Sequence, residues 1–362
     1  MATTCGTTAP VRGSVWRAWG RALLGGAVMA SALGAGNALG EALARLLGVE
    51  GYPRQLLPAA LVSALAVPAV LGLRAMRSTR RCPMGLGPRS SAPLGFLRGV
   101  AVTASCAAAA LGAGTALGWV RWSALDPGAL ASFLVGNALV AVLLEALPEE
   151  ATLRGFAWAS LRDRLGGVIS ALGTTAVFLL VPAASTVAQA GVSRLVGVAA
   201  PPMGLTPAGQ DPMAYLVLLS VFGLTLLAAR TAPGSAPLWV AIGTHVAFLS
   251  VNRVVFEGVQ RDAGWSAKVA PAHAAVIELG YLAATAMVFV GARVVSSRVR
   301  ARAQRRGPGR PSAATTHSAG VWAGAGPRLV PAGREWPSAV GGEWPSHGRG
   351  ARIIRRGEVG RL

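Results

Sequence analysis

Glu149, Glu150 and Arg154 form the densest group of ionisable residues within the long apolar stretches of the chain. Glu150 and Arg154 are four residues apart, which is the spacing of an ion pair on one face of a helix. Glu149 points about 100° away from Glu150, so we predict that it faces a cavity, with Glu145 one turn behind it. A carboxylate left free in this way can take a proton from water, which is the general-base step of hydrolysis.

A histidine, His245, lies inside a second apolar segment, 238–255, at a depth of about 10 Å for a helical rise of 1.5 Å per residue. Glu149 approaches the same depth from another helix, and a carboxylate beside an imidazole can activate a water molecule. Asn252 either donates a hydrogen bond to a developing oxyanion or satisfies a neighbouring helix. The predicted catalytic residues are Glu149, Glu150 and His245, and the predicted supporting residues are Arg154, Glu145 and Asn252.

Each of these residues also has a structural interpretation. The pair of Glu150 and Arg154 is equally typical of a salt bridge that anchors a helix end, and a lone buried histidine usually packs against its neighbours. His273 and Glu278 complete the set of candidates, because ionisable groups inside a bilayer are costly and usually functional.

The elements that position these residues are predicted to be membrane-spanning helices. The chain is 53% hydrophobic and only 13% charged, whereas about 25% is usual for a soluble domain. We therefore predict an all-α, polytopic integral membrane protein and exclude a soluble enzyme domain or a dedicated nucleic-acid-binding module. Pro148 is expected to end the fourth span and to begin a new helical segment, whose N-terminus favours carboxylates. Eight spans are expected, at residues 22–40, 56–73, 99–118, 130–147, 167–187, 213–229, 238–255 and 269–290.

The net charge of +20 is spread unevenly along the chain. Residues 291–362 contain fourteen Arg and three Glu and are rich in Pro and Gly, which predicts a disordered tail drawn to anionic lipid head groups. Basic residues also gather in the segment 74–98, so the positive-inside rule places both termini in the cytoplasm. The expected organisation is a basic N-terminal segment (1–21), a membrane domain (22–290) and the tail.

Composition also limits which partners and which cellular location we expect for the protein. We expect contacts with membrane lipids and with a membrane-tethered peptide or protein substrate, and no nucleic-acid partner. Cys5, Cys82 and Cys106 are too scattered for a disulfide framework or a zinc site of their own. The abundance of Arg, Ala and Gly, with Lys268 as the single lysine, reflects genome composition and favours a multi-pass protein of a bacterial cell membrane.

The pattern of residues resembles the CPBP family, the intramembrane proteases related to the type II CAAX prenyl protease and to bacteriocin-processing enzymes. Its first signature, E-E-x-x-x-R, is present at residues 149–154 and is followed by Gly-Phe at 155–156. A late histidine after a Trp-containing approach looks like His245 after Trp239. The resemblance covers about residues 130–255.

The resemblance implies a function and roles for the residues. Glu149 would be the general base, and Glu150 and Arg154 would support it. Family members are described as metalloproteases, which implies zinc held by Glu149 and His245, and a metal-independent mechanism driven by glutamate is the other mechanism argued for the family. The implied substrates are membrane-associated or prenylated peptides cut near the cytoplasmic face.

Two positions depart from the family pattern. The second signature, F-x-x-x-H, begins at Phe178 but has Pro182 where the histidine stands, and the Asn expected four residues after His245 is Leu249. A zinc ion would then have fewer nitrogen ligands than catalytic zinc usually has. The leading prediction is an intramembrane endopeptidase. The alternatives are a catalytically inactive relative, serving as a membrane scaffold or immunity-type protein, and a transporter, which the lack of an obvious internal repeat disfavours.

Overall fold

The structure, a computed structural model, describes residues 12–76, 83–200, 202–204, 206 and 210–305. Within these residues, eight helices are long and apolar enough to cross a membrane, which confirms the predicted number of spans. The first three are α1 (Arg12–Leu46), α2 (Gly51–Ala75) and α3 (Ala92–Ala116), and a short 3₁₀ turn, η1 (Arg89–Ser91), leads into α3. The others are a long helix from Pro127 to Arg162, α7 (Gly167–Val196), α8 (Pro212–Arg230), α9 (Pro237–Val255) and α10 (Pro271–Arg305).

Prolines and aspartates set where several of these helices begin. A proline opens α8, α9 and α10, and it suits that place because the first helical residue needs no N–H donor. Asp126 caps the long helix, since its Oδ1 accepts hydrogen bonds of 3.0 Å from the backbone N–H groups of Gly128 and Ala129. Asp211 does the same for α8 through Ala214, at 2.7 Å. These caps satisfy N–H groups that a helix start leaves unpaired.

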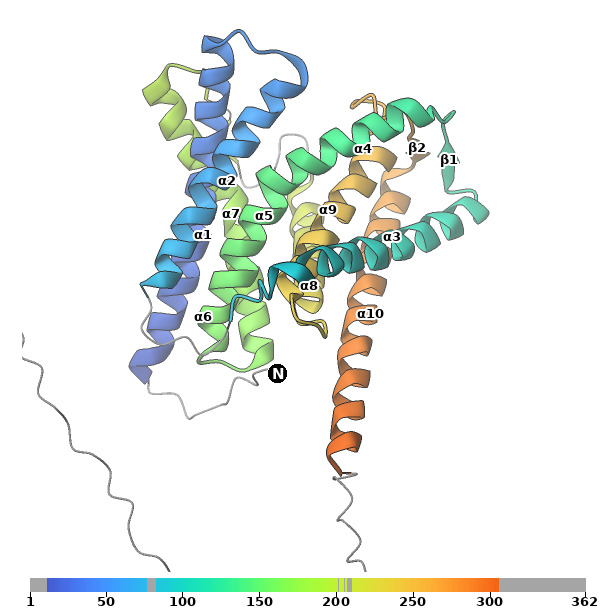
Figure 1. Cartoon of the computed structure of the whole chain (residues 1–362). Coiled ribbons are helices and arrows are strands. Elements are labelled where there is room, and N and C mark those ends of the chain that lie inside the picture. The colour runs from blue at the N-terminus through green and yellow to red at the C-terminus, as the bar shows by residue number, and fades with distance from the viewer. Residues whose placement is uncertain (1–11, 77–82, 201, 205, 207–209, 306–362) are drawn as a thin grey trace, which may run out of the picture. The chain divides into compact units, whose positions relative to one another are not determined.

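The fourth span is one continuous helix, and the prediction that Pro148 begins a new segment is wrong. It passes from α4 (Pro127–Ala141) through η2 (Val142–Ala146), α5 (Leu147–Glu149) and η3 (Glu150–Ala157) into α6 (Trp158–Arg162) (Figure 1). The segments η2 and η3 are π-helical, and such wider turns interrupt α-helices frequently at functional sites. Because they flank Pro148, the helix continues past a residue that has no N–H. Glu149 and Glu150 therefore lie in the helix interior, about 18 Å from its Arg162 end.

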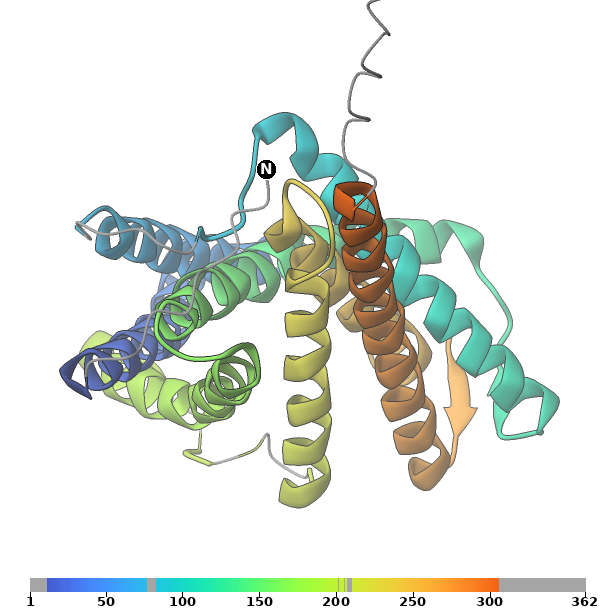
Figure 2. The same ribbon diagram turned by 90° about the horizontal axis from the view of Figure 1, so that it is seen from below.

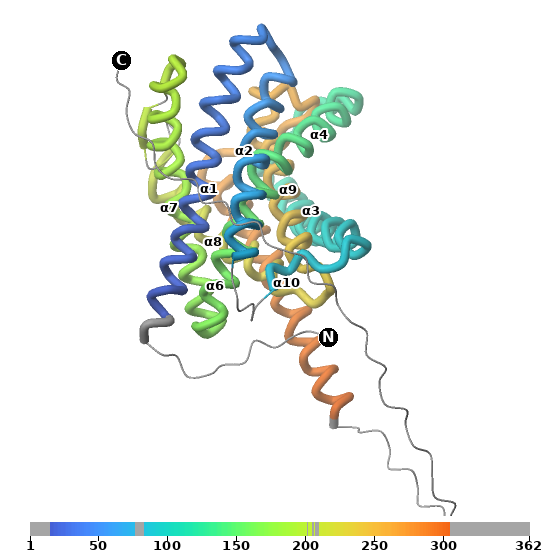
Figure 3. The backbone as a smooth tube through the Cα atoms, turned by 60° about the vertical axis from the view of Figure 1, so that its left-hand side comes forward, coloured from blue at the N-terminus to red at the C-terminus, as the bar shows by residue number. Residues whose placement is uncertain are grey.

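Helix α1 packs closely against α7 and α2, as the tube in Figure 3 shows. Its glycines bring the backbones together: a Cβ atom on Gly34 would lie 2.5 Å from the carbonyl oxygen of Ser185 in α7, and one on Gly40 would lie 2.6 Å from the Cα of Pro58 in α2. Small residues at such contacts are typical of helices packed in membranes. On the other side of the bundle, α8 lies beside α10 (Figure 2) and α3 lies beside α9.

Two short strands are an addition to the predicted all-α fold. Strand β1 (Val120–Trp122) follows α3, and strand β2 (Ala267–Val269) precedes α10. They pair in antiparallel fashion, with Val120 opposite Val269 and Trp122 opposite Ala267. We call this pair the β ribbon; it joins the connection between α3 and α4 to the connection between α9 and α10.

The C-terminal boundary of the membrane domain also differs from the prediction. Helix α10 continues to Arg305, so residues 291–305, predicted as the start of a disordered tail, are helical. The rest of the predicted tail, from residue 306, and residues 1–11 of the predicted N-terminal segment lie outside the described residues. The cytoplasmic location of both termini stays a prediction.

We expect Gly34→Ala to destabilise the protein and Gly20→Ala to leave it as stable or more stable. Both glycines lie in α1, but a Cβ on Gly20 would meet nothing within 4 Å, whereas one on Gly34 would press on the backbone of α7. Overpacking of this kind costs about 1–3 kcal/mol, while alanine at an open helical position gains up to about 1 kcal/mol over glycine. Thermal unfolding of both variants in the same detergent checks this, and equal midpoints would contradict it.

Candidate active site

Glu150 is the centre of a buried cluster of three ionisable side chains. Its Oε1 lies 3.2 Å from Nδ1 of His245 and 3.3 Å from Nη1 of Arg154. Glu150 and Arg154 are 0% exposed, and His245 is 2% exposed. The predicted ion pair between residues 150 and 154 is therefore present, and His245, ninety-five residues away in sequence, joins it from α9.

Arg154 is held on its other side by an aromatic ring. Its guanidinium carbon lies 4.4 Å from the centroid of the Phe178 ring in α7, which is a cation–π contact. Its three guanidinium nitrogens and Oε2 of Glu150 have no hydrogen-bond partner in the described part of the protein. Buried polar atoms that have no protein partner are commonly hydrogen-bonded to ordered water molecules in protein interiors.

His245 is oriented by its two neighbours. The ring of Phe222, in α8, meets it edge-on at a centroid distance of 4.9 Å. When Nδ1 donates its proton to the Glu150 carboxylate, the lone pair of the neutral imidazole is on Nε2. No described residue forms a hydrogen bond with Nε2. The arrangement thus leaves one ring nitrogen available as a hydrogen-bond acceptor.

Glu149 is the free carboxylate that the sequence predicts. It is only 8% exposed, and no hydrogen bond or ion pair joins its side chain to another described residue. It lies within electrostatic range of His245, Glu145 and Arg154. The direct contact of His245 is with Glu150, so the two adjacent glutamates have different surroundings, as their 100° separation predicts.

Glu145, one turn before Glu149, is not free, because it forms an ion pair with Arg253 in α9. Arg253 also donates a hydrogen bond of 3.1 Å to Oδ1 of Asn137, and the amide of Asn137 donates one of 3.1 Å to Ser250. This network joins the fourth span to α9 on one side of the cluster. The sequence analysis missed Arg253. A basic residue near the end of an apolar segment predicts an acidic partner, and this signal could have identified it.

The remaining candidates lie apart from the buried cluster. Oδ1 of Asn252 accepts a hydrogen bond of 2.6 Å from the Tyr281 hydroxyl in α10, which is the helix-satisfying role that the sequence left open. His273 stacks on Trp119 at 4.5 Å. Glu278 is partly buried in α10 and has no hydrogen-bond or ion-pair partner among the described residues.

The position of the missing family histidine lies on the helix that contacts the cluster. Phe178, which contacts Arg154, is one turn before Pro182 on α7. Pro182 is partly buried and offers no side-chain hydrogen-bonding group. Leu249, at the second departing position, is also partly buried.

The predicted zinc site does not fit the residues present. Among the described residues, no three His, Cys, Asp or Glu side chains gather as metal ligands would. Oε1 of Glu150 is already in contact with a guanidinium and an imidazole, which leaves Glu149 and His245 as donors. Catalytic zinc usually has three protein ligands, and we derive no step that uses a metal.

A loop and a buried arginine close one end of the site. Arg230, in α8, donates a hydrogen bond of 3.2 Å to the carbonyl oxygen of Arg154 and one of 3.0 Å to that of Pro83. Met84, the next residue of this loop, packs against Ala151 and Phe156 in η3. Sequence reasoning missed Arg230 because its acceptors are backbone carbonyls far away in sequence. The loop and Arg230 together hold the turn that carries Glu150 and Arg154.

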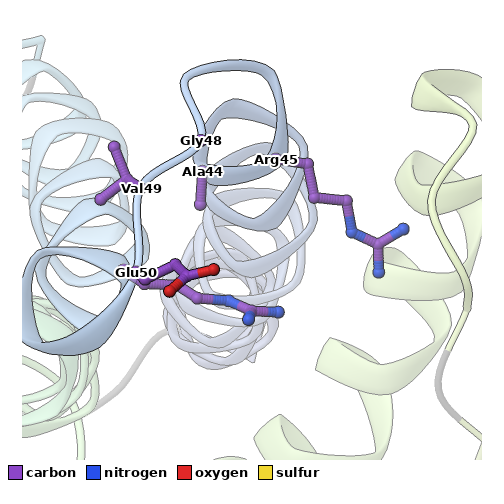
Figure 4. A pocket seen from close by; sticks show the side chains of 6 residues that line it. Ala44, Arg45, Gly48, Val49 and Glu50 are labelled. Carbon is purple, nitrogen blue, oxygen red and sulfur yellow. The ribbon is translucent and has the colours of Figure 1, made fainter.

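A pocket of about 340 Å³ lies elsewhere, where α1 meets α2 (Figure 4). Arg45 and Arg54, which line it, are both paired with Glu41. None of the predicted site residues lines this pocket. It is therefore separate from the candidate active site.

The buried pair of Glu150 and Arg154 should respond to substitution differently from an exposed pair of the same spacing. We expect Glu150→Gln and Arg154→Met each to cost several kcal/mol of unfolding free energy, because each leaves one charge buried and unpaired. The double variant should cost less than the sum. Glu257 and Arg261 form a matched exposed i,i+4 pair, whose removal should cost under about 1 kcal/mol. Additive losses at residues 150 and 154 in unfolding experiments would refute the coupling.

One comparison with known proteins covers the part of the chain that forms this site. Residues 131–251 match the family model described as type II CAAX prenyl endopeptidase Rce1-like. No curated protein and no solved structure matches the chain. The matched segment begins in α4 and ends in α9, so it contains the whole buried cluster. The family match agrees with the resemblance predicted from E-E-x-x-x-R and His245: the part of this multi-pass membrane protein that holds the candidate site is similar to the Rce1-like type II CAAX prenyl endopeptidases.

Proposed function

We propose that the protein is an intramembrane endopeptidase that hydrolyses peptide bonds of membrane-associated or prenylated peptides, with Glu149 as the general base. The observation that carries this proposal is the contrast between two adjacent buried glutamates. Glu150 is paired with Arg154 and His245, while Glu149 has no partner among the described residues. A free carboxylate beside an oriented imidazole is the arrangement that activates water.

The proposed reaction needs only these side chains and one water molecule. Glu149 accepts one proton of the water, and Nε2 of His245 accepts a hydrogen bond from the other O–H group. The water oxygen attacks the carbonyl carbon of the scissile peptide bond. Glu149 then returns the proton to the amide nitrogen as the C–N bond breaks, which leaves a carboxylic acid and an amine and restores the Glu149 carboxylate. Glu150 and Arg154 act through His245 as positioning residues.

The location of the site fits a substrate that is already in the membrane. Glu149 lies inside the fourth span, Pro127–Arg162, and not in a connecting loop. A peptide carried by a lipid chain reaches this depth with less desolvation cost than a soluble peptide does, because its anchor is already in the hydrocarbon region. The membrane that we propose is the cell membrane.

We expect Glu149→Gln to lower the rate of cleavage at least 100-fold, because a general base contributes about 10²–10⁴-fold. The assay uses purified protein in liposomes and a membrane-tethered reporter peptide. Glu278→Gln is the matched control, because it removes a partly buried carboxylate in α10 that lies outside the cluster. Equal activity of the wild type and Glu149→Gln would refute the assignment.

Metal chelation should leave the proteolytic rate within about twofold of its starting value, because Glu149 and His245 are fewer donors than catalytic zinc takes. The measurement is cleavage before and after treatment with a strong zinc chelator, followed by dialysis. Loss of activity that added zinc restores would contradict this expectation.

A catalytically inactive membrane scaffold is the second candidate function, and Pro182 is the observation that favours it. The same liposome assay separates the two. If neither the wild type nor Pro182→His cleaves any tethered peptide, while the wild type binds a partner protein, the scaffold function is supported. Cleavage by the wild type supports the endopeptidase.

A further inference from the structure

The β ribbon lies where four spans end or begin. Strand β1 is between the spans that end at Ala116 and begin at Pro127, and strand β2 is between those that end at Val255 and begin at Pro271. Figure 1 shows the two strands beside each other at the ends of α3 and α10. Because the helices on either side are membrane spans, this ribbon lies at the boundary between hydrocarbon and water.

Two positive charges face each other across the ribbon. Arg121 is directly opposite Lys268, and both are exposed. Directly opposed side chains have Cβ atoms about 5 Å apart, and like charges in such pairs are destabilising. Neither residue has an ion-pair partner in the described part of the protein. Asp126, the next acid along the chain, already accepts hydrogen bonds from two backbone N–H groups.

The other side chains of the ribbon are those of a membrane interface. Trp122 stacks on Trp265 at a centroid distance of 4.3 Å, and its indole N–H donates a hydrogen bond of 3.0 Å to Thr115. Trp119, just before β1, stacks on His273 at 4.5 Å. Tryptophan is enriched at the depth of lipid head groups, where one end of its ring is apolar and the other is wet.

We propose that Arg121 and Lys268 together bind the phosphate of an anionic phospholipid head group at this interface. A phosphate placed between two opposed cations removes their repulsion and accepts charge-assisted hydrogen bonds from both. The stacked tryptophans fix the depth at which that phosphate must lie, which favours a lipid over a soluble anion. This proposal is independent of the proteolytic function.

Lipid bound here would stabilise the connections to both halves of the candidate site. The β1 connection leads into the fourth span, which carries Glu149 and Glu150, and the β2 connection follows α9, which carries His245. A single head group would therefore add a further link between two connections that the paired strands and the stacked tryptophans already join. The expected signature is lipid-dependent thermal stability.

The test compares the wild type with Arg121→Gln/Lys268→Gln (the ribbon variant) and with the control Arg89→Gln/Arg194→Gln. The control removes the same charge from two exposed arginines, one in η1 and one near the end of α7, both outside the ribbon and the basic C-terminal segment. Each protein is titrated in neutral detergent with phosphatidylglycerol, phosphatidylcholine or inorganic phosphate, and binding is followed by native mass spectrometry and thermal unfolding.

Phosphatidylglycerol should bind the ribbon variant roughly 10- to 30-fold more weakly than it binds the wild type, since each basic residue near the membrane surface contributes a factor of up to about five. It should raise the unfolding temperature of the wild type and the control but not of the ribbon variant. Without lipid, the ribbon variant should be at least as stable as the wild type, because the repulsion is gone.

Three results would overturn the proposal. One is equal binding of phosphatidylglycerol to the wild type and the ribbon variant, and another is an equal stabilisation by inorganic phosphate, which would indicate a site for soluble anions. The third is that, without lipid, both the ribbon variant and Lys268→Gln alone unfold more readily than the wild type. The pair would then have a structural role.

Discussion

The contact of Glu150 with both Arg154 and His245 is the interaction on which the rest of the site depends. All three side chains are almost fully buried, so the opposite charges of Glu150 and Arg154 are tolerated only because each lies beside the other. The contact fixes the face of the fourth span that meets α9, and thereby the direction in which Glu149 points. It also determines that Nδ1, and not Nε2, of His245 forms the hydrogen bond with Glu150. The ion pair of Glu150 with Arg154 therefore also positions Glu149, the candidate general base.

Contacts on both sides of this cluster hold the fourth span against its neighbouring helices. On one side, Glu145 pairs with Arg253 and joins the fourth span to α9. On the other, Arg230 donates hydrogen bonds to the backbone carbonyls of Arg154 and Pro83 and so joins α8 to both segments. Intramembrane arginines are costly unless their donors are satisfied. Arg253 and Arg230 therefore tie the two π-helical turns to α9 and α8, one on each side of the cluster.

The sequence was sufficient for features that depend on local spacing. Eight apolar stretches predicted eight spans, and the spacing of Glu150 and Arg154 predicted their ion pair, because both rules act within one helix. It failed at Pro148, where the flanking π-helical turns override the usual effect of proline. It could not find the partner of Glu145 or the acceptors of Arg230, because these are set by packing between distant segments. The β ribbon was missed because three-residue strands leave no periodic pattern.

The central claim is that Glu150 holds His245 with its proton on Nδ1 and leaves Nε2 as an acceptor. Nitrogen-15 NMR of the protein labelled in its histidine rings measures this directly, since protonated and unprotonated ring nitrogens have well-separated shifts. The account predicts that neutral His245 carries its proton on Nδ1 and that Glu150→Gln changes this tautomer population. A neutral His245 protonated on Nε2 in the wild type, unaffected by Glu150→Gln, would contradict the account.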